Sequence, residues 1–173
     1  PIQFCPRALC LHVTLLAALA DPSISAAASV DWNTTAPLSV WHDPGNRLGG
    51  AVPAILDRAR IGSLPGVENS GLRIDQPVFI ADLDVLDGMA LLNLSPDGVI
   101  HPITVSETAQ TNGVNLDLPA PKRSTIRLFH GPTAYDLRAN YLELANESRL
   151  DLRGGAVVDI DDIVFIGSGS AIE

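Results

Sequence analysis

The chain has 173 residues, enough for one domain with a sizeable core. Hydrophobic residues make up 46% of it and aromatic residues only 5%, which suits thin repetitive layers better than a core built around large rings. The formal net charge of −9 excludes nucleic acid and anionic lipid as expected partners, because both are negatively charged. Acidity of this degree fits an extracellular role, or surface carboxylates that collect divalent cations.

The N-terminal segment has the pattern of a secretory signal peptide. An apolar run, Ala8–Ala20, follows the cation Arg7, and the small residues Ala26 and Ala28 provide a cleavage site. The run is shorter than the ~20 apolar residues that span a bilayer. We therefore expect residues 1–28 to be a signal peptide, with a buried core helix as the alternative.

Removal of this segment would leave a mature protein without cysteine. Cys5 and Cys10 both precede the expected cleavage site near Ser29. The mature chain would then hold no disulfide and no thiol nucleophile, and it has no later stretch apolar enough for a membrane helix. The expected location is secreted or at the cell surface. Because the sequence starts at Pro1 without methionine and ends at Glu173 within an apparent strand, we also expect a longer protein.

Residues 29–70 are predicted to form a small cap that is rich in turns, prolines and glycines. The residues expected to build it are both tryptophans, Trp32 and Trp41, and the turn residues Asp43 and Asn46. Short strands are predicted within the cap at Ser29–Trp32, Ser39–Trp41 and Ala59–Ile61.

Residues 71–173 consist of short alternating runs rich in Val, Ile and Leu, separated by Gly, Asn and Asp. Such runs are typical of β-strands, and no convincing helix is expected. The predicted strands are Leu72–Ile74, Val78–Val85, Ala90–Leu94, Ile103–Val105, Val114–Leu118, Ile126–Phe129, Tyr141–Leu144, Arg149–Leu152, Ala156–Ile160 and Ile163–Ile166.

Several of these runs resemble one another. Leu142–Leu150 and Val164–Ile172 share a template in which two apolar positions, two residues apart, precede a polar turn and another apolar position. Leu83–Leu91 fits the same template, and looser versions begin at Ile103 and Ile126. A period of roughly 20 residues in a strand-rich chain is typical of a solenoid that adds one layer per repeat.

The predicted fold class is therefore all-β: a parallel β-helix (β-solenoid) over residues 71–173, truncated at the C-terminus, with the cap at its start. Each turn of such a fold sends apolar residues inward and leaves polar residues on the outer faces. An end that nothing covers presents unpaired backbone groups and invites strand addition. A β-sandwich, whose strands recur every ~8–12 residues, is the alternative.

The cap also carries an ordered set of motifs. Trp32 is followed by Ser39–Asn46 with its Asp-Pro turn, then by Gly49–Pro53, and then by the strand Asp57–Ile61. In this order the motifs resemble the N-terminus of bacterial autotransporter-like or PEP-CTERM-type β-helix proteins, which continue into repeated β-rungs. The sequence departs from that pattern at Arg47, where the family usually has a third tryptophan. The resemblance implies an exported, adhesin-like scaffold and carries over no catalytic residue.

An acidic turn is the candidate metal site. Asp159, Asp161 and Asp162 could supply the hard oxygen ligands that calcium prefers. The glycine-rich calcium repeat and the EF-hand loop are absent from the sequence, so a solvated turn is the favoured interpretation. No other cofactor is expected. Metal-binding histidine spacing is also absent from the mature chain, whose histidines are His42, His101 and His130.

Two functions are compatible with these features. The favoured one is a scaffold or adhesin-like binding module without catalytic activity, whose partner is an extracellular polysaccharide or another cell-surface component. The alternative is a carbohydrate-active β-helix enzyme, a polysaccharide lyase or a glycoside hydrolase, in which Asp82 or Asp84 would converge with an arginine, such as Arg127, on one exposed face. The local basic patch of Lys122, Arg123 and Arg127 is interpreted as the polar flank of a strand.

Overall fold

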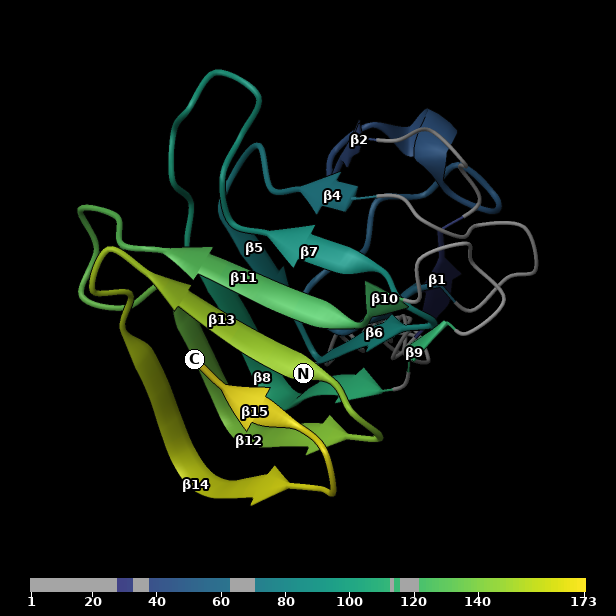
Figure 1. Ribbon diagram of the computed structural model, residues 1–173. Helices are drawn as coiled ribbons and strands as arrows, with labels where there is room; N and C mark the ends of the chain where they lie inside the picture. Colours follow the sequence, from purple (N-terminus) through teal and green to yellow (C-terminus); the bar gives the residue numbers. More distant parts are fainter. Residues whose placement is uncertain (1–27, 33–37, 63–70, 113, 116–121) are drawn as a thin grey trace, which may run out of the picture.

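The computed structural model describes residues 28–32, 38–62, 71–112, 114–115 and 122–173, which form an all-β structure (Figure 1). The one helical element among these residues is the short 3-10 helix η1 (Pro44–Asn46). The prediction of a strand-rich chain without a long helix is therefore confirmed for the described residues. The predicted signal peptide lies outside them, apart from Ala28.

Two sheets contain most of the strands. Sheet I has seven strands, in the order β1 (Ser29–Asp31), β3 (Arg58–Ile61), β6 (Asp82–Leu86), β8 (Ile103–Asn112), β12 (Leu137–Ala145) and β14 (Val158–Ile166), with β5 (Val78–Ile80) also paired to β8. Sheet II has six strands, in the order β2 (Leu38–Val40), β4 (Gly71–Arg73), β7 (Ala90–Leu92), β11 (Thr125–Phe129), β13 (Arg149–Arg153) and β15 (Ala171–Ile172). A separate antiparallel pair consists of β9 (Val114–Asn115) and β10 (Lys122–Arg123).

Every strand pair within sheets I and II is parallel. Parallel neighbours cannot be joined by a tight hairpin, so the chain must leave a sheet and return between them. It does this by passing through the other sheet, so the strands of sheets I and II alternate along the chain, except that β5 and β6 are consecutive and both belong to sheet I. An immunoglobulin-type β-sandwich consists of antiparallel sheets, so the observed pairing differs from the alternative fold.

Sheet I bends at a corner. Ala139 of β12 pairs with Val105 and Ile160, whereas the next paired residue, Tyr141, pairs with Thr108 and Ile163. One residue of β12 thus lies opposite two residues in each neighbouring strand, which is the arrangement of a β-bulge and bends the strands locally. The bend is visible in β14 in Figure 1. Because of this bend, the two strands predicted as Ala156–Ile160 and Ile163–Ile166 are one bent strand, β14.

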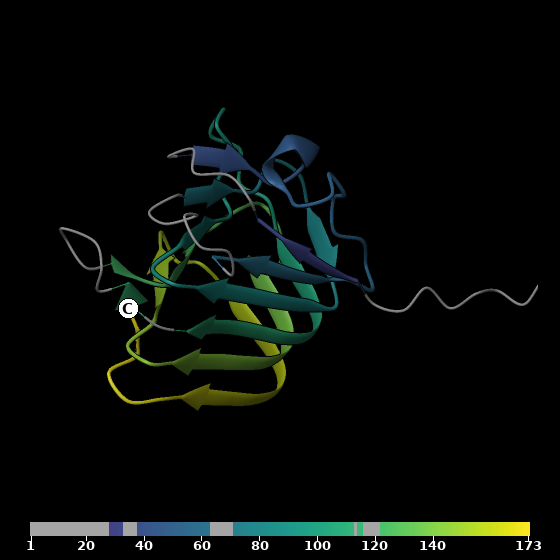
Figure 2. The same cartoon turned by 90° about the vertical axis from the view of Figure 1, so that its right-hand side faces the viewer.

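The strands of each sheet lie one above another (Figure 2), and inward side chains that line up from strand to strand form the core. In sheet I, one such column contains Ala59, Leu83, Ala109 and Leu142. In sheet II, a second column contains Leu72, Leu91, Ile126 and Leu150. All of these side chains are buried. Burying a leucine or isoleucine stabilises the fold by about 1.5–3 kcal/mol, so the aliphatic columns supply the stabilisation that few aromatic residues could provide.

The two most similar segments of the sequence lie side by side. Leu142 pairs with Val164 in sheet I, and Leu150 pairs with Ile172 in sheet II. Leu83 belongs to the same column as Leu142, through Ala109. The looser matches occupy other columns, because Ile103 pairs with Leu137 and Ile126 lies in sheet II.

The predicted cap contributes strands to both sheets. Its strand β3 pairs with β6, and its strand β2 pairs with β4. The turn after Trp41 is held by the Asp43 carboxylate, which accepts a hydrogen bond from Gly45 N at 2.9 Å. Asn46 donates from Nδ2 to the carbonyl of Val40 at 3.3 Å. The rings of Trp32 and Trp41 lie with their centroids 5.0 Å apart.

Arg47 lies against these two rings, at the position where the resemblance leads one to expect a third tryptophan. Its side chain is only 2% exposed, and its guanidinium carbon lies 4.2 Å from the ring centre of Trp32. Nη1 donates to the carbonyl of Asp43 at 2.8 Å. Burial lowers the pKa of Arg47 to about 10, which still leaves it protonated at neutral pH. The arginine therefore takes a place in the cap by stacking as a planar cation on aromatic faces.

Candidate functional site

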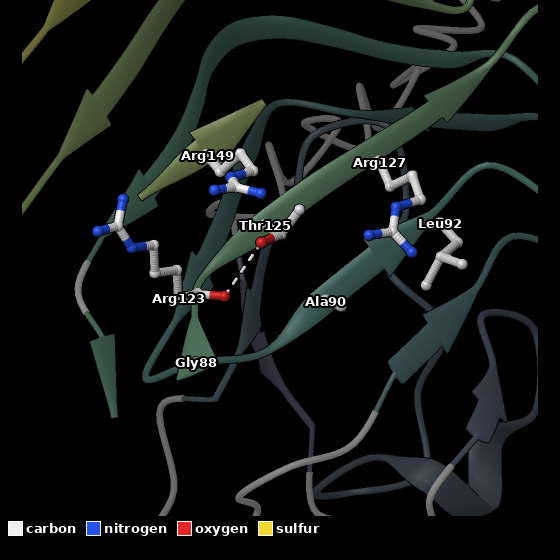
Figure 3. Close-up of a pocket in the computed structure, with 7 residues that line it drawn as sticks. All are labelled: Gly88, Ala90, Leu92, Arg123, Thr125, Arg127 and Arg149. Carbon is white, nitrogen blue, oxygen red and sulfur yellow. Dashed lines mark hydrogen bonds between the residues drawn. The ribbon is translucent and has the colours of Figure 1, made fainter. Parts of the chain in front are cut away.

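The candidate site is a cleft on the outer face of sheet II, on the side facing away from the core. It has a volume of about 330 Å³ (Figure 3). Arginines are the prominent members of its lining. The lining residues are Gly88, Ala90, Leu92, Arg123, Thr125, Arg127 and Arg149. In a chain with 11 basic and 20 acidic residues, three arginines around one cleft form a local concentration of positive charge.

Strand alternation and register explain why these residues meet. In β11, Ile126 and Leu128 are buried in the core, so Thr125 and Arg127 point to the outer face. Parallel pairing places Ala90 on one side of Thr125 and Arg149 on the other. The small side chain at Ala90, with Gly88 close by, leaves a hollow between the long arginine side chains, which Figure 3 shows extending from β11 and β13.

Each arginine of the cleft is oriented by a carboxylate. Arg127 Nε donates to Asp151 Oδ2 at 2.6 Å, Arg149 lies 3.1 Å from Glu173, and Arg123 lies 3.6 Å from Glu147. Asp151 is shared, because Arg153 Nε lies 2.5 Å from its other oxygen. Four arginines thus face three carboxylates on this surface. A guanidinium has five N–H donors in a fixed fork, so these contacts leave donors for a ligand.

Asp151 gives the site a definite response to acid. Burial alone would raise the pKa of Asp151, but hydrogen bonds from Arg153 and Arg127, together with their charges, outweigh burial and lower it. A carboxyl group whose pKa is lower in the folded state stabilises the protein above its unfolded pKa of about 3.9. That stabilisation is lost as the pH falls through the lower pKa of the folded state.

Replacing Asp151 by asparagine is therefore expected to make the free energy of unfolding less dependent on acidic pH. The variant should be less stable than the wild type at neutral pH, because Arg127 and Arg153 lose their shared anion. The difference should shrink as the pH falls below the unfolded pKa of about 3.9 and through the lower pKa of the folded state, because the wild-type carboxyl group then becomes protonated as well. Urea unfolding across this pH range measures the effect, and parallel curves for the two proteins would contradict it.

The structure enlarges the basic patch that the sequence suggested. Arg123 and Arg127 both line the cleft, and the register of β11 with β13 adds Arg149, which had not been singled out. The side chain of Lys122 lies outside the described part of the chain. Only the pairing of Thr125 with Arg149 reveals that residues distant in sequence share one surface. The shared alternation of apolar residues in β11 and β13 is the sequence signal that could have indicated their pairing.

The carboxylates considered for an enzyme lie elsewhere. Asp84 belongs to sheet I, where Arg58 Nε donates to it at 2.9 Å and Arg60 lies 3.8 Å away. Asp82 accepts a hydrogen bond from the backbone N–H of Thr108 at 3.1 Å. Arg127 projects from sheet II. The structure therefore does not bring Asp82 or Asp84 together with Arg127, and Asp84 is instead a buried partner of Arg58 within sheet I.

The acidic turn lies at the corner of β14. Arg138 Nη2 donates to both carboxylate oxygens of Asp161, at 3.1 and 3.2 Å, and Arg138 Nε lies 3.6 Å from Asp159. The hydrogen bond with Asp161 is the main cause of a raised pKa of Arg138. Within the described ranges, no group of three or more His, Cys, Asp or Glu side chains is arranged to hold a metal. Calcium binding by Asp162 and its neighbours stays a prediction.

The histidines do not share a site. His42 Nδ1 lies 2.7 Å from Asp75, and His130 Nδ1 lies 3.1 Å from Asp136. The backbone N–H of His101 donates to the carbonyl of Asn93. These contacts hold the loops in which His42, His101 and His130 lie.

Comparison of the chain with protein-family models, with curated proteins and with solved structures gave no match. The resemblance to autotransporter-like and PEP-CTERM-type proteins therefore stays a prediction. No helix in the described part of the chain is long and apolar enough to cross a membrane.

Proposed function

We propose that this chain is an exported β-solenoid binding module of the adhesin-like class, and that its arginine-lined cleft holds an acidic polysaccharide. The observation that carries the proposal is the cleft itself, with Arg123, Arg127 and Arg149 around a hollow on an ordered sheet. The module would act as a scaffold that presents a binding surface and carries out no reaction of its own.

The strand arrangement supports the solenoid part of the proposal. The chain passes back and forth between two parallel sheets, and each return adds one strand to a sheet, or, with β5 and β6, two consecutive strands to sheet I. Pairing of Leu142 with Val164, and of Leu150 with Ile172, gives both sheets the same sequence separation in this layer. A solenoid stacks layers in this way, and the result is an extended surface suited to an extended ligand.

The chemistry of the cleft supports an anionic ligand. Guanidinium groups match carboxylates and sulfates through paired hydrogen bonds, which lysine ammonium groups cannot form. Thr125 adds a hydroxyl group between Arg123 and Arg127, and Ala90 and Leu92 provide an apolar floor. Sugar acids combine carboxylates, hydroxyl groups and apolar ring faces, so a polymer of uronic acids offers a complementary partner for each type of lining residue.

The overall charge of the protein shapes how this binding should behave. The net charge of −9 repels an acidic polymer at long range, whereas the arginines attract it at close range. The contacts should therefore be short-ranged and weakened by salt, because exposed charges are screened beyond about 8 Å at physiological ionic strength.

Binding of a fluorescently labelled oligogalacturonate tests the proposal. The wild type should bind it and should not bind a neutral oligosaccharide of the same length. Changing both Arg123 and Arg149 to glutamine should weaken binding at least about tenfold, which corresponds to ~1.4 kcal/mol. Arg138→Gln is the matched control, since Arg138 is a similarly exposed arginine of sheet I, and this variant should bind like the wild type.

Three results would count against the proposal. Equal affinity for the neutral oligosaccharide would remove the role of charge, and an equal loss in the Arg138→Gln variant would remove the role of the cleft. Release of new reducing ends from the acidic oligosaccharide would show an enzyme and would contradict a scaffold. Melting temperatures of all variants serve to separate loss of binding from loss of folding.

A further inference from the structure

The outer face of β11 carries an aromatic side chain beyond the arginine-lined cleft. The two buried residues of this strand are Ile126 and Leu128. By alternation, its outward residues are Thr125, Arg127 and Phe129, of which the first two line the cleft. Figure 3 shows β11 continuing past Arg127. At ~3.3 Å per residue, Phe129 lies ~13 Å along the strand from Thr125, so the cleft and this aromatic ring follow one line.

A buried asparagine fixes the backbone that carries Phe129. The pairing of β7 with β11 ends at Leu92 and Arg127, two residues before Phe129. The side chain of Asn93 continues this pairing, because Phe129 N donates to Asn93 Oδ1 at 2.7 Å and Asn93 Nδ2 donates to Phe129 O at 2.9 Å. Asn93 is fully buried. An aromatic ring on a backbone held in this way needs little further ordering when a ligand binds.

Two arginines flank Phe129 on the same face of the sheet. Arg153 is the residue paired with Phe129 on β13, and Arg127 lies two residues before Phe129 on β11. The buried carboxylate of Asp151 contacts both arginines. It accepts a hydrogen bond from Arg127 Nε at 2.6 Å and another from Arg153 Nη2 at 3.0 Å. One carboxylate therefore orients two guanidinium groups beside the ring, and its single charge does not cancel both of theirs.

Both guanidinium groups keep donors for a ligand. Each has five N–H donors in a planar fork. Asp151 contacts Nε of Arg127, and it contacts Nε and Nη2 of Arg153. The two arginine side chains are 43% and 55% exposed, so both reach solvent. An aromatic ring between two oriented cations favours a ligand that has an apolar face and an acidic group at its edge.

We propose that Phe129, Arg127 and Arg153 form a second subsite, which binds one sugar-acid ring of an acidic polysaccharide. The ring stacks its C–H face on Phe129, and its carboxylate binds the two arginines. A pyranose ring suits this arrangement because its faces carry apolar C–H groups while its polar groups lie at the edge. The bound polymer runs along β11, from the cleft toward Phe129. This inference rests on the proposed function, to which it adds a direction and a minimum length of the bound polymer.

Labelled oligogalacturonates of two lengths test the second subsite with the full polypeptide. A dimer is long enough for the cleft alone, whereas a hexamer also reaches Phe129. The wild type should bind the hexamer at least tenfold more tightly than the dimer. Phe129→Ala and Arg153→Gln should each weaken hexamer binding at least fivefold and change dimer binding less than twofold. Phe79→Ala is the matched control and should bind like the wild type, since Phe79 is an exposed phenylalanine on β5 of sheet I.

Phe129→Trp separates stacking from folding. Tryptophan keeps a flat aromatic face, so this variant should retain hexamer binding, and its fluorescence should change when the hexamer binds. The wild type, whose Trp32 and Trp41 are buried, supplies the background signal. A wild type that binds neither oligomer would contradict the proposed function and this inference with it. Four results would overturn the second subsite alone: equal affinity of the wild type for both lengths, unchanged hexamer binding by Phe129→Ala, an equal loss for both lengths in that variant, or loss of hexamer binding in Phe129→Trp with an unaltered melting temperature.

Discussion

Replacing Gly62 by alanine should lower the free energy of unfolding by about 3–5 kcal/mol, among the largest effects expected of a single methyl group in this protein. Gly62 follows β3 and has a φ of 89°, a conformation that residues with a Cβ atom rarely adopt. A Cβ atom here would overlap the carbonyl oxygen of Leu86 and would lie 2.8 Å from Cγ of Met89. Both neighbours belong to the adjoining layer, so relief of the clash would require the two layers to separate.

Gly98→Ala is the matched control. Gly98 has a φ of 86°, but no atom lies within 4 Å of the position that its Cβ atom would occupy. The free energy of unfolding of this variant should fall only by the cost of left-handed backbone strain, about 1–2 kcal/mol. Urea unfolding of both variants measures the effects, and their difference isolates the contact between layers. Equal losses in the two variants would contradict the close approach of β3 and the β6–β7 turn.

Asp136→Ala should also destabilise the protein strongly, by about 2–5 kcal/mol. The carboxylate is fully buried and accepts hydrogen bonds from the backbone N–H groups of Gly131 and Val157, both at 2.8 Å. It also lies 3.1 Å from His130 Nδ1. Alanine would leave these donors without a partner, and an unsatisfied buried donor costs about 1–3 kcal/mol. The loop before β12 and the start of β14 would lose their common anchor.

Asp136→Asn separates the role of shape from that of the second acceptor oxygen. Asparagine keeps one acceptor oxygen but points an NH₂ group at a backbone donor, so its stability should lie between those of the wild type and the alanine variant. Chemical denaturation of the three proteins gives the order. Hydrogen exchange at Gly131 and Val157 should be fastest in the alanine variant. An alanine variant within about 0.5 kcal/mol of the wild type would contradict the anchoring role.

Much of the local structure could be predicted because it depends on short-range alternation. The pattern of Ile126 and Leu128 between polar residues predicts a strand with an inner and an outer face, and β11 has both. The hydrogen bonds of Asp43 and Asn46 join residues close in sequence, so they too depend on a short-range pattern. By contrast, β8 was predicted as Ile103–Val105 and extends to Asn112, because pairing with β6 and β12 supports its polar second half.

The candidate site could be predicted only in part. Arg123 and Arg127 are near neighbours in the sequence, whereas Arg149 joins them through the register of two parallel strands. The proposed convergence of Asp84 with Arg127 was wrong for the same reason. Sequence alternation places both side chains on outer faces, but it does not state which sheet each strand enters. In the folded protein Asp84 is neutralised by Arg58 within sheet I.

The sequence by itself determined that this protein is built from short strands, that its core is aliphatic, and that Trp32 and Trp41 belong to one turn-rich region. These properties follow from residue types and from spacings of a few residues. The tertiary structure decided which strands are neighbours, and with them the arginine cleft and the stacking of Arg47 on the two tryptophans. The cleft depends on parallel partners more than 20 residues apart in the sequence, such as Thr125 and Arg149. At that distance, packing and backbone pairing between layers select the partner, and no local pattern specifies it.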